Sequence, residues 1–160
     1  MGIPLATAAF WTVAGAGLVW IFGGVLLYGW RRKSPPLILA VAGISSLCGL
    51  GNALLGSAHL AVVLARAAAG RGFAGSETFA YGFHFYSLVL VGVLLVLPGC
   101  LCLYHARGVV RLEPAARSGA LRSSLVLLAV NLPMMPFQPF AILLSVLAGA
   151  SAAALALTRG

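Results

Sequence analysis

Charged residues, and acidic ones above all, are scarce in this sequence. Only 8% of the 160 residues are charged, and the acids are Glu77 and Glu113, with no aspartate. A soluble domain carries about 25% charged residues, so this chain has too few to cover a water-facing surface. Two acids in predicted loops also exclude paired-carboxylate chemistry and carboxylate proton relays within a membrane.

Cysteine motifs and activated-serine motifs are also lacking. The three cysteines, Cys48, Cys100 and Cys102, form no CxxC pair, which excludes a thioredoxin-like or zinc-ribbon site. The sequence Ser57-Ala58-His59 has no strand-to-helix elbow and no third group to orient the histidine. We therefore expect no enzymatic activity.

Long apolar segments make up most of the sequence. The chain is 62% hydrophobic with a mean hydropathy of +1.09, and about 20 apolar residues are enough to cross a bilayer. The sequence predicts an all-α integral membrane protein, a four-transmembrane-helix bundle that forms a single transmembrane domain over residues 1–160. The expected helices cover about 5–28, 37–64, 79–105 and 123–157, the last with a break near 133–139.

The last apolar stretch is too long for one straight crossing. Its 35 residues would make a helix of about 52 Å, against a hydrocarbon layer of about 30 Å. Prolines at three-residue spacing interrupt it, so it is either one kinked helix or a short half-segment followed by a spanning helix. Backbone groups freed by prolines line ligand sites in some transporters. The candidate ligand or kink site comprises Asn131, Pro133, Pro136, Gln138 and Pro139.

Basic residues lie between the apolar runs, where membrane proteins place them, so the net charge of +8 does not indicate nucleic-acid binding. We expect the partners to include membrane lipids with anionic headgroups. Seven of the ten basic residues fall in the first and third expected loops, which the positive-inside rule assigns to the cytoplasm. Four crossings then put both termini on the non-cytoplasmic side. The heavy use of Arg, Ala and Gly suggests a GC-rich genome and favours the bacterial cytoplasmic membrane.

Polar residues recur every seven positions in two of the apolar runs. A spacing of seven is two helical turns, so the members of each set share a helix face. Such faces, with small residues beside them, are typical of helix packing in lipid. The first set is Ser45, Asn52, His59 and Arg66, flanked by Gly49 and Gly56; the second is Ser124, Asn131, Gln138 and Ser145.

His59 and His84 form the sharpest candidate site for a cofactor. Each lies about five residues from the outer end of its expected helix, on consecutive antiparallel helices. Two imidazoles at one depth are a suitable ligand pair for haem b or a metal ion. The alternative is that each histidine makes an ordinary hydrogen bond between helices, and we expect no cofactor.

The preferred function is that of a small accessory, structural or assembly subunit of a larger membrane complex. Its partners would be other integral membrane subunits or copies of itself. Small residues on the first helix let another helix approach closely, and the expected contact residues there are Gly15, Gly17, Gly23 and Gly24. The alternatives are a redox subunit that uses His59 and His84, and a small transporter or channel component that uses the proline-broken stretch.

Overall fold

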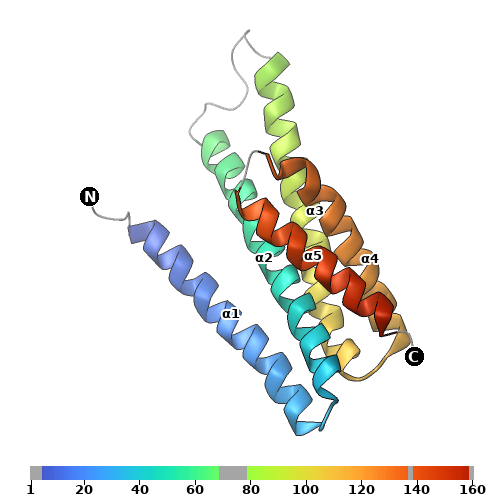
Figure 1. The fold of residues 1–160 in the computed structure, drawn as a ribbon. Helices are drawn as coiled ribbons and strands as arrows, with labels where there is room; N and C mark the ends of the chain where they lie inside the picture. The colour runs from blue at the N-terminus through green and yellow to red at the C-terminus, as the bar shows by residue number, and fades with distance from the viewer. Residues whose placement is uncertain (1–4, 69–78, 137–138, 159–160) are drawn as a thin grey trace.

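The computed structural model describes residues 5–68, 79–136 and 139–158, and every secondary-structure element in these ranges is a helix. The all-α prediction is confirmed for this part of the chain. Figure 1 shows the elements in order: α1 (Leu5–Arg31), α2 (Pro36–Ala68), α3 (Phe79–Val110), α4 (Pro114–Asn131), a 3-10 turn (Leu132–Met134) and α5 (Pro139–Leu157).

The described residues form five α-helices, one more than the sequence predicts. The additional element is α4, which begins at Pro114, whereas we expected a loop as far as Arg122. Proline is well suited to the first turn of a helix, and the alanines that follow are good helix formers. Arg117 and Arg122 interrupt the apolar run, so hydropathy alone places the start of this helix too late.

The stretch 123–157 is therefore not one kinked helix. It resembles the expected half-segment followed by a spanning helix, except that the half-segment belongs to a longer helix that begins at Pro114. Pro133 lies in the 3-10 turn that follows α4, and Pro139 opens α5, so the expected break near 133–139 separates two helices. The 18 residues of α4 span about 27 Å. This is close to the thickness of the hydrocarbon layer, but α4 is not among the described stretches that are apolar enough to cross it.

Successive helices run in opposite directions (Figure 1). The start of α4 lies beside the end of α5, where Arg117 Nε donates a hydrogen bond of 3.0 Å to the Leu155 carbonyl oxygen. This cation also complements the negative end of the α5 dipole. The start of α1 and the end of α5 thus lie at opposite ends of the bundle (Figure 1). This arrangement does not support the expectation that both termini share one side of the membrane.

The most extensive helix contact joins α2 and α3, and glycines on both helices bring their backbones together. A Cβ atom at Gly49 would lie 2.6 Å from the Gly99 carbonyl oxygen, and one at Gly56 would lie 2.6 Å from the Gly92 carbonyl oxygen. No real Cβ tolerates such a distance. The two contacts are seven residues apart on each helix, so glycine is required at two successive levels of one interface.

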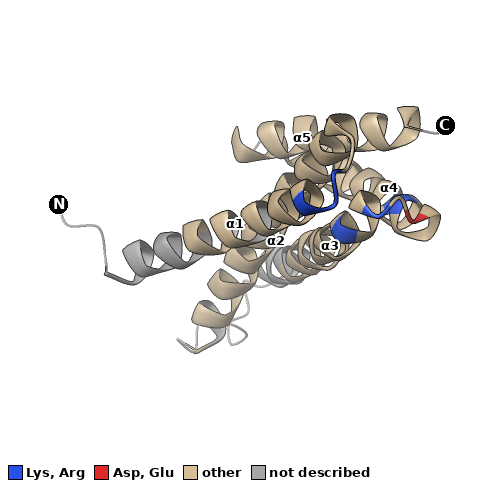
Figure 2. Cartoon of the chain, turned by 90° about the horizontal axis from the view of Figure 1, so that it is seen from below, with Lys and Arg blue, Asp and Glu red and all other residues tan. Residues whose placement is uncertain are grey.

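The α1–α2 and α3–α4 turns have the same backbone geometry. Lys33 and Leu112 take positive φ angles of 53° and 60°. The next residue in each turn, Ser34 or Glu113, donates its N–H to a carbonyl five residues earlier, at 3.1 and 3.0 Å. This is the Schellman motif, which ends a helix sharply. Both turns lie at the same end of the bundle, and Figure 2 shows Lys and Arg gathered there.

Three helical stretches among the described residues are long and apolar enough to cross a membrane. They are Pro36–Ala65, Val89–Val110 and Pro139–Leu157.

Candidate functional site

The polar face of α2 points into the bundle at two of its four positions. Ser45 and Asn52 are fully buried, and His59 is half-buried nearer the end of the helix. The side chain of Arg66 lies outside the described residues. Gly49 and Gly56, which flank this face, are the glycines that contact α3.

The second polar set divides between two helices. Ser124 and Asn131 lie on α4, whereas Ser145 lies on α5, and all three are buried. Gln138 falls outside the described residues. This set therefore does not form one continuous helix face, yet its described members all point into the bundle.

The two polar sets meet through their asparagines. Asn131 Nδ2 donates a hydrogen bond of 2.6 Å to Asn52 Oδ1. Each amide also donates to a carbonyl one turn earlier on its own helix, Asn52 to Cys48 and Asn131 to Leu127, both at 2.8 Å. These are the only two asparagines in the chain, and both are completely buried. The amide pair fixes α4 against α2.

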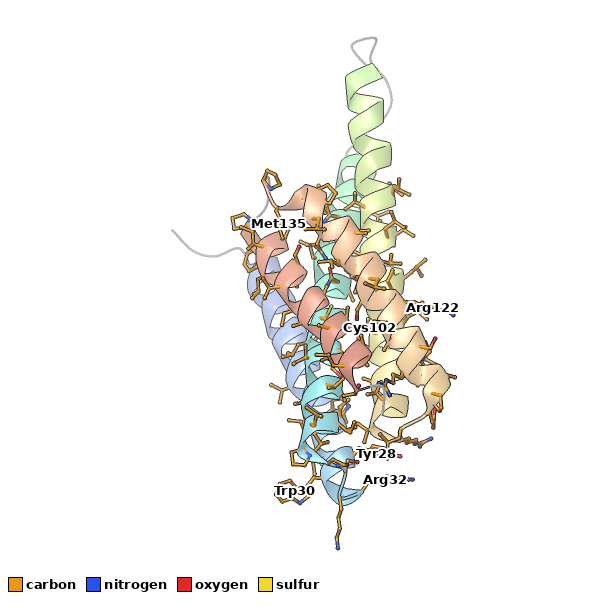
Figure 3. All side chains as sticks on the ribbon, turned by 45° about the vertical axis from the view of Figure 1, so that its right-hand side comes forward. Tyr28, Trp30, Arg32, Cys102, Arg122 and Met135 are labelled. Carbon is orange, nitrogen blue, oxygen red and sulfur yellow. The ribbon has the colours of Figure 1, made fainter. Side chains whose placement is uncertain are left out.

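A second polar level lies seven residues earlier on α2 and on α4, toward the end of the bundle that carries the two basic turns. Ser124 Oγ is 3.0 Å from Ser151 Oγ on α5 and 3.8 Å from Cys102 Sγ on α3. Figure 3 shows Cys102 at mid-height in the bundle. We call the two levels together the polar seam: Ser45, Asn52, Cys102, Ser124, Asn131, Ser145 and Ser151.

The seam keeps some hydrogen-bonding capacity. Ser45 Oγ, Asn131 Oδ1 and Ser145 Oγ are buried and have no hydrogen-bond partner among the described residues. Since α4 and α5 are antiparallel and Ser124 pairs with Ser151, Ser145 falls within about one residue of the level of Asn131. A single water or a hydroxyl rotation at this level would satisfy both groups. The amides and hydroxyls of the seam do not ionise near neutral pH, and their hydrogen bonds specify how the helices pack.

The histidine pair is only half described. His59 Nδ1 lies 2.8 Å from the Leu55 carbonyl oxygen, and this bond requires the proton on Nδ1. His84 belongs to α3, but its side chain lies outside the described residues, so the haem or metal site between these histidines remains a prediction. Within the described ranges, no cluster of three or more His, Cys, Asp or Glu side chains is placed to hold a metal ion.

The proline-rich segment joins α4 to α5 at the end of the bundle away from the basic turns (Figure 1). Pro133 and Pro136 are exposed, and Pro139 is exposed at the start of α5. Figure 3 shows Met135 at this end, far from Arg32. Of the described members of the proposed ligand or kink site, only Asn131 reaches the polar seam; Gln138 lies outside the described residues.

The four glycines of α1 have open space beside them among the described residues. A Cβ atom at Gly15, Gly17, Gly23 or Gly24 would have no described atom within 4 Å. These positions differ in this respect from Gly29, near the end of the same helix, where a Cβ would collide with the Leu39 side chain.

Tyr28 marks a basic cluster that the sequence analysis did not identify. Arg111 Nε donates a hydrogen bond of 2.6 Å to the Tyr28 hydroxyl. The guanidinium groups of Arg32 and Arg111 lie 5.4 and 5.5 Å from the centre of its ring. Tyr28 and Arg111 are 83 residues apart, so only the positive-inside rule, which puts both turns on one side, could have suggested that they meet.

Comparison with protein-family models, with curated proteins and with solved structures finds no match to this chain. Function is therefore inferred from the geometry of the chain itself.

The asparagine pair should show energetic coupling. We expect Asn52→Ala and Asn131→Ala to have a coupling energy of about 0.6 to 1.7 kcal/mol in a double-mutant cycle, the range found for hydrogen bonds between membrane helices. Free energies of unfolding from denaturing-detergent titration supply the four corners of the cycle. Ser46→Ala is the control, because Ser46 donates only to Ala42 on its own helix and should be additive with Asn131→Ala. Additivity of the asparagine variants within about 0.3 kcal/mol would contradict the bond.

Proposed function

We propose that this chain is a non-enzymatic integral membrane protein that acts as an accessory subunit and docks on a helix of a partner membrane protein through α1. The observation that carries the proposal is the position of α1, which joins the rest of the bundle only near its C-terminal end. Figure 1 shows its other end standing apart from α2.

The attachment of α1 is small and local. Val25 is buried in one cluster with Val41 of α2 and Val110 of α3, and Tyr28 packs at the edge of that cluster. Less than two turns earlier, Val19 and Trp20 are 75% and 84% exposed. The earlier part of the described α1 surface is thus left open to lipid or to another protein.

Glycine on this open surface favours a protein neighbour. Each glycine in a helix interior costs about 1 kcal/mol relative to alanine. Its benefit in lipid is that another helix can approach closely. With nothing beside it in this chain, a glycine on α1 carries the cost without the benefit unless a partner helix packs there.

The proposed topology has five crossings, with the N-terminus outside and the C-terminus in the cytoplasm of a bacterial cell. α1 has 27 residues, or about 40 Å, and is long enough to cross. Arg159 then joins the seven basic residues of the two turns and α4 on the cytoplasmic side, which raises the share there to eight of the ten in the chain. Arg122, exposed two turns into α4, can extend along the helix so that its charge reaches the interface.

A reporter fused after Gly160 should be active in the cytoplasm. We expect a fluorescent protein to fluoresce there and alkaline phosphatase to be inactive, because five crossings return the chain to the inner side. The matched control is a fusion after Asn131, at the end of α4, where phosphatase should be active. Phosphatase activity at Gly160 would contradict the five-crossing arrangement.

The redox and transporter alternatives have no observation in their favour among the described residues. His84 is not described at the side-chain level, and the exposed prolines lie at the bundle end, away from the polar seam.

Bulky residues at Gly15 and Gly17 should weaken the docking of α1. Leucine introduced into a close helix contact costs about 1–3 kcal/mol, or roughly a 5- to 150-fold loss of affinity. The measurement is the amount of membrane partner, or of a second tagged copy, that is retained with each variant in mild detergent. Ala153→Leu on α5 is the control, because Ala153 is exposed and is not one of the glycines on which the proposal rests. Equal retention by the α1 variants and Ala153→Leu would overturn the assignment of α1.

A further inference from the structure

An open groove of about 1100 Å³ lies between α1 and α3 and ends at the start of α4. Val19, Trp20 and Leu27 line its α1 side, and Leu103 and Tyr104 line its α3 side. Gly23 and Gly24 make the α1 wall shallow. Most of this surface is apolar and opens sideways from the bundle.

One end of the groove is cationic. Arg107 and Arg111 line it there, beside the single carboxylate of Glu113. The hydrogen bond from Arg111 to Tyr28, with Glu113 nearby, raises the pKa of the Arg111 guanidinium, so this group stays positively charged. Glu113 Oε1 lies 3.6 Å from Arg111 Nη1, whereas exposed Arg107 makes no ion pair with any described residue.

We infer that this groove binds one anionic phospholipid. The Arg107 guanidinium pairs with the headgroup phosphate, and Arg111 adds positive charge beside it. Guanidinium groups match phosphate oxygens in charge and geometry. An acyl chain lies along the apolar walls formed by Trp20 and Leu103.

Two features favour a lipid over a partner helix at this place. The groove is apolar along its length and cationic only at the end where the basic turns lie, and this is the polarity of a lipid in the inner leaflet. Basic pockets between helices on the cytoplasmic side are typical sites for anionic headgroups. Gly15 and Gly17 precede the α1 residues that line the groove, so the two sites use different parts of α1, and the inference depends on membrane insertion and not on the docking of α1.

Trp20 provides a direct probe of the groove. The chain has three tryptophans, and Trp11→Phe with Trp30→Phe leaves Trp20 as the sole emitter. This protein is placed in nanodiscs of phosphatidylcholine that contain an equal mole fraction of either brominated phosphatidylglycerol or brominated phosphatidylcholine. Quenching by both lipids reports insertion, and the difference between them reports the site.

We expect stronger quenching by brominated phosphatidylglycerol. Arg107→Gln should reduce this preference about fivefold, the effect of removing one cation at a lipid surface. Arg122→Gln is the matched control, because Arg122 is exposed on α4 and lies outside the groove; it should leave the preference unchanged. Equal quenching by the two lipids would overturn the inference. An equal loss of the preference in Arg107→Gln and Arg122→Gln would also overturn it, because it would show diffuse attraction to the membrane surface.

Discussion

The hydrogen bond between Asn52 and Asn131 is the constraint on which the rest of the bundle depends. It joins α2 to α4 at full burial and at a donor–acceptor distance of 2.6 Å. A buried amide without a partner in an apolar interior is costly, so α4 can take few other rotations against α2. The serine level seven residues away lies in the same register, and α5 is held to α4 there through Ser151. The glycine contacts between α2 and α3 hold α3 close to the same centre.

The chain thereby separates into a constrained part and an unconstrained part. Helices α2 to α5 share the polar seam, whereas α1 adds none of its described side chains to the seam and joins through an apolar cluster and Tyr28. The same separation leaves two parts of α1 open along its length. The part from Val19 to Leu27 lines the groove beside α3, for which we infer a lipid, and the part that precedes it is available to a partner helix.

Much of this arrangement was predictable from periodicity. The seven-residue spacing of Ser45 and Asn52, and of Ser124 and Asn131, predicts one polar face on each of two helices. Such spacing does not say that these faces meet, because that depends on how the chain is folded back. Hydropathy missed the start of α4 because Arg117 and Arg122 interrupt the apolar run. The additional helix puts the end of α5 at the opposite end of the bundle from the start of α1. The Tyr28–Arg111 contact and the groove between α1 and α3 both bring together residues that are distant in the sequence. No local sequence pattern predicts either of them.

The most direct test of the central claim uses the fact that the chain has two asparagines and no others. Protein labelled only at asparagine with ¹³C and ¹⁵N, in lipid bilayers, allows solid-state NMR to measure the distance between the two side-chain amides. We predict a through-space contact from the Asn131 Nδ2 nitrogen to the Asn52 Cγ carbon, which disappears in Asn131→Ala. Two asparagine side chains with no detectable contact, in protein that remains folded, would contradict the polar seam and the five-helix arrangement built on it.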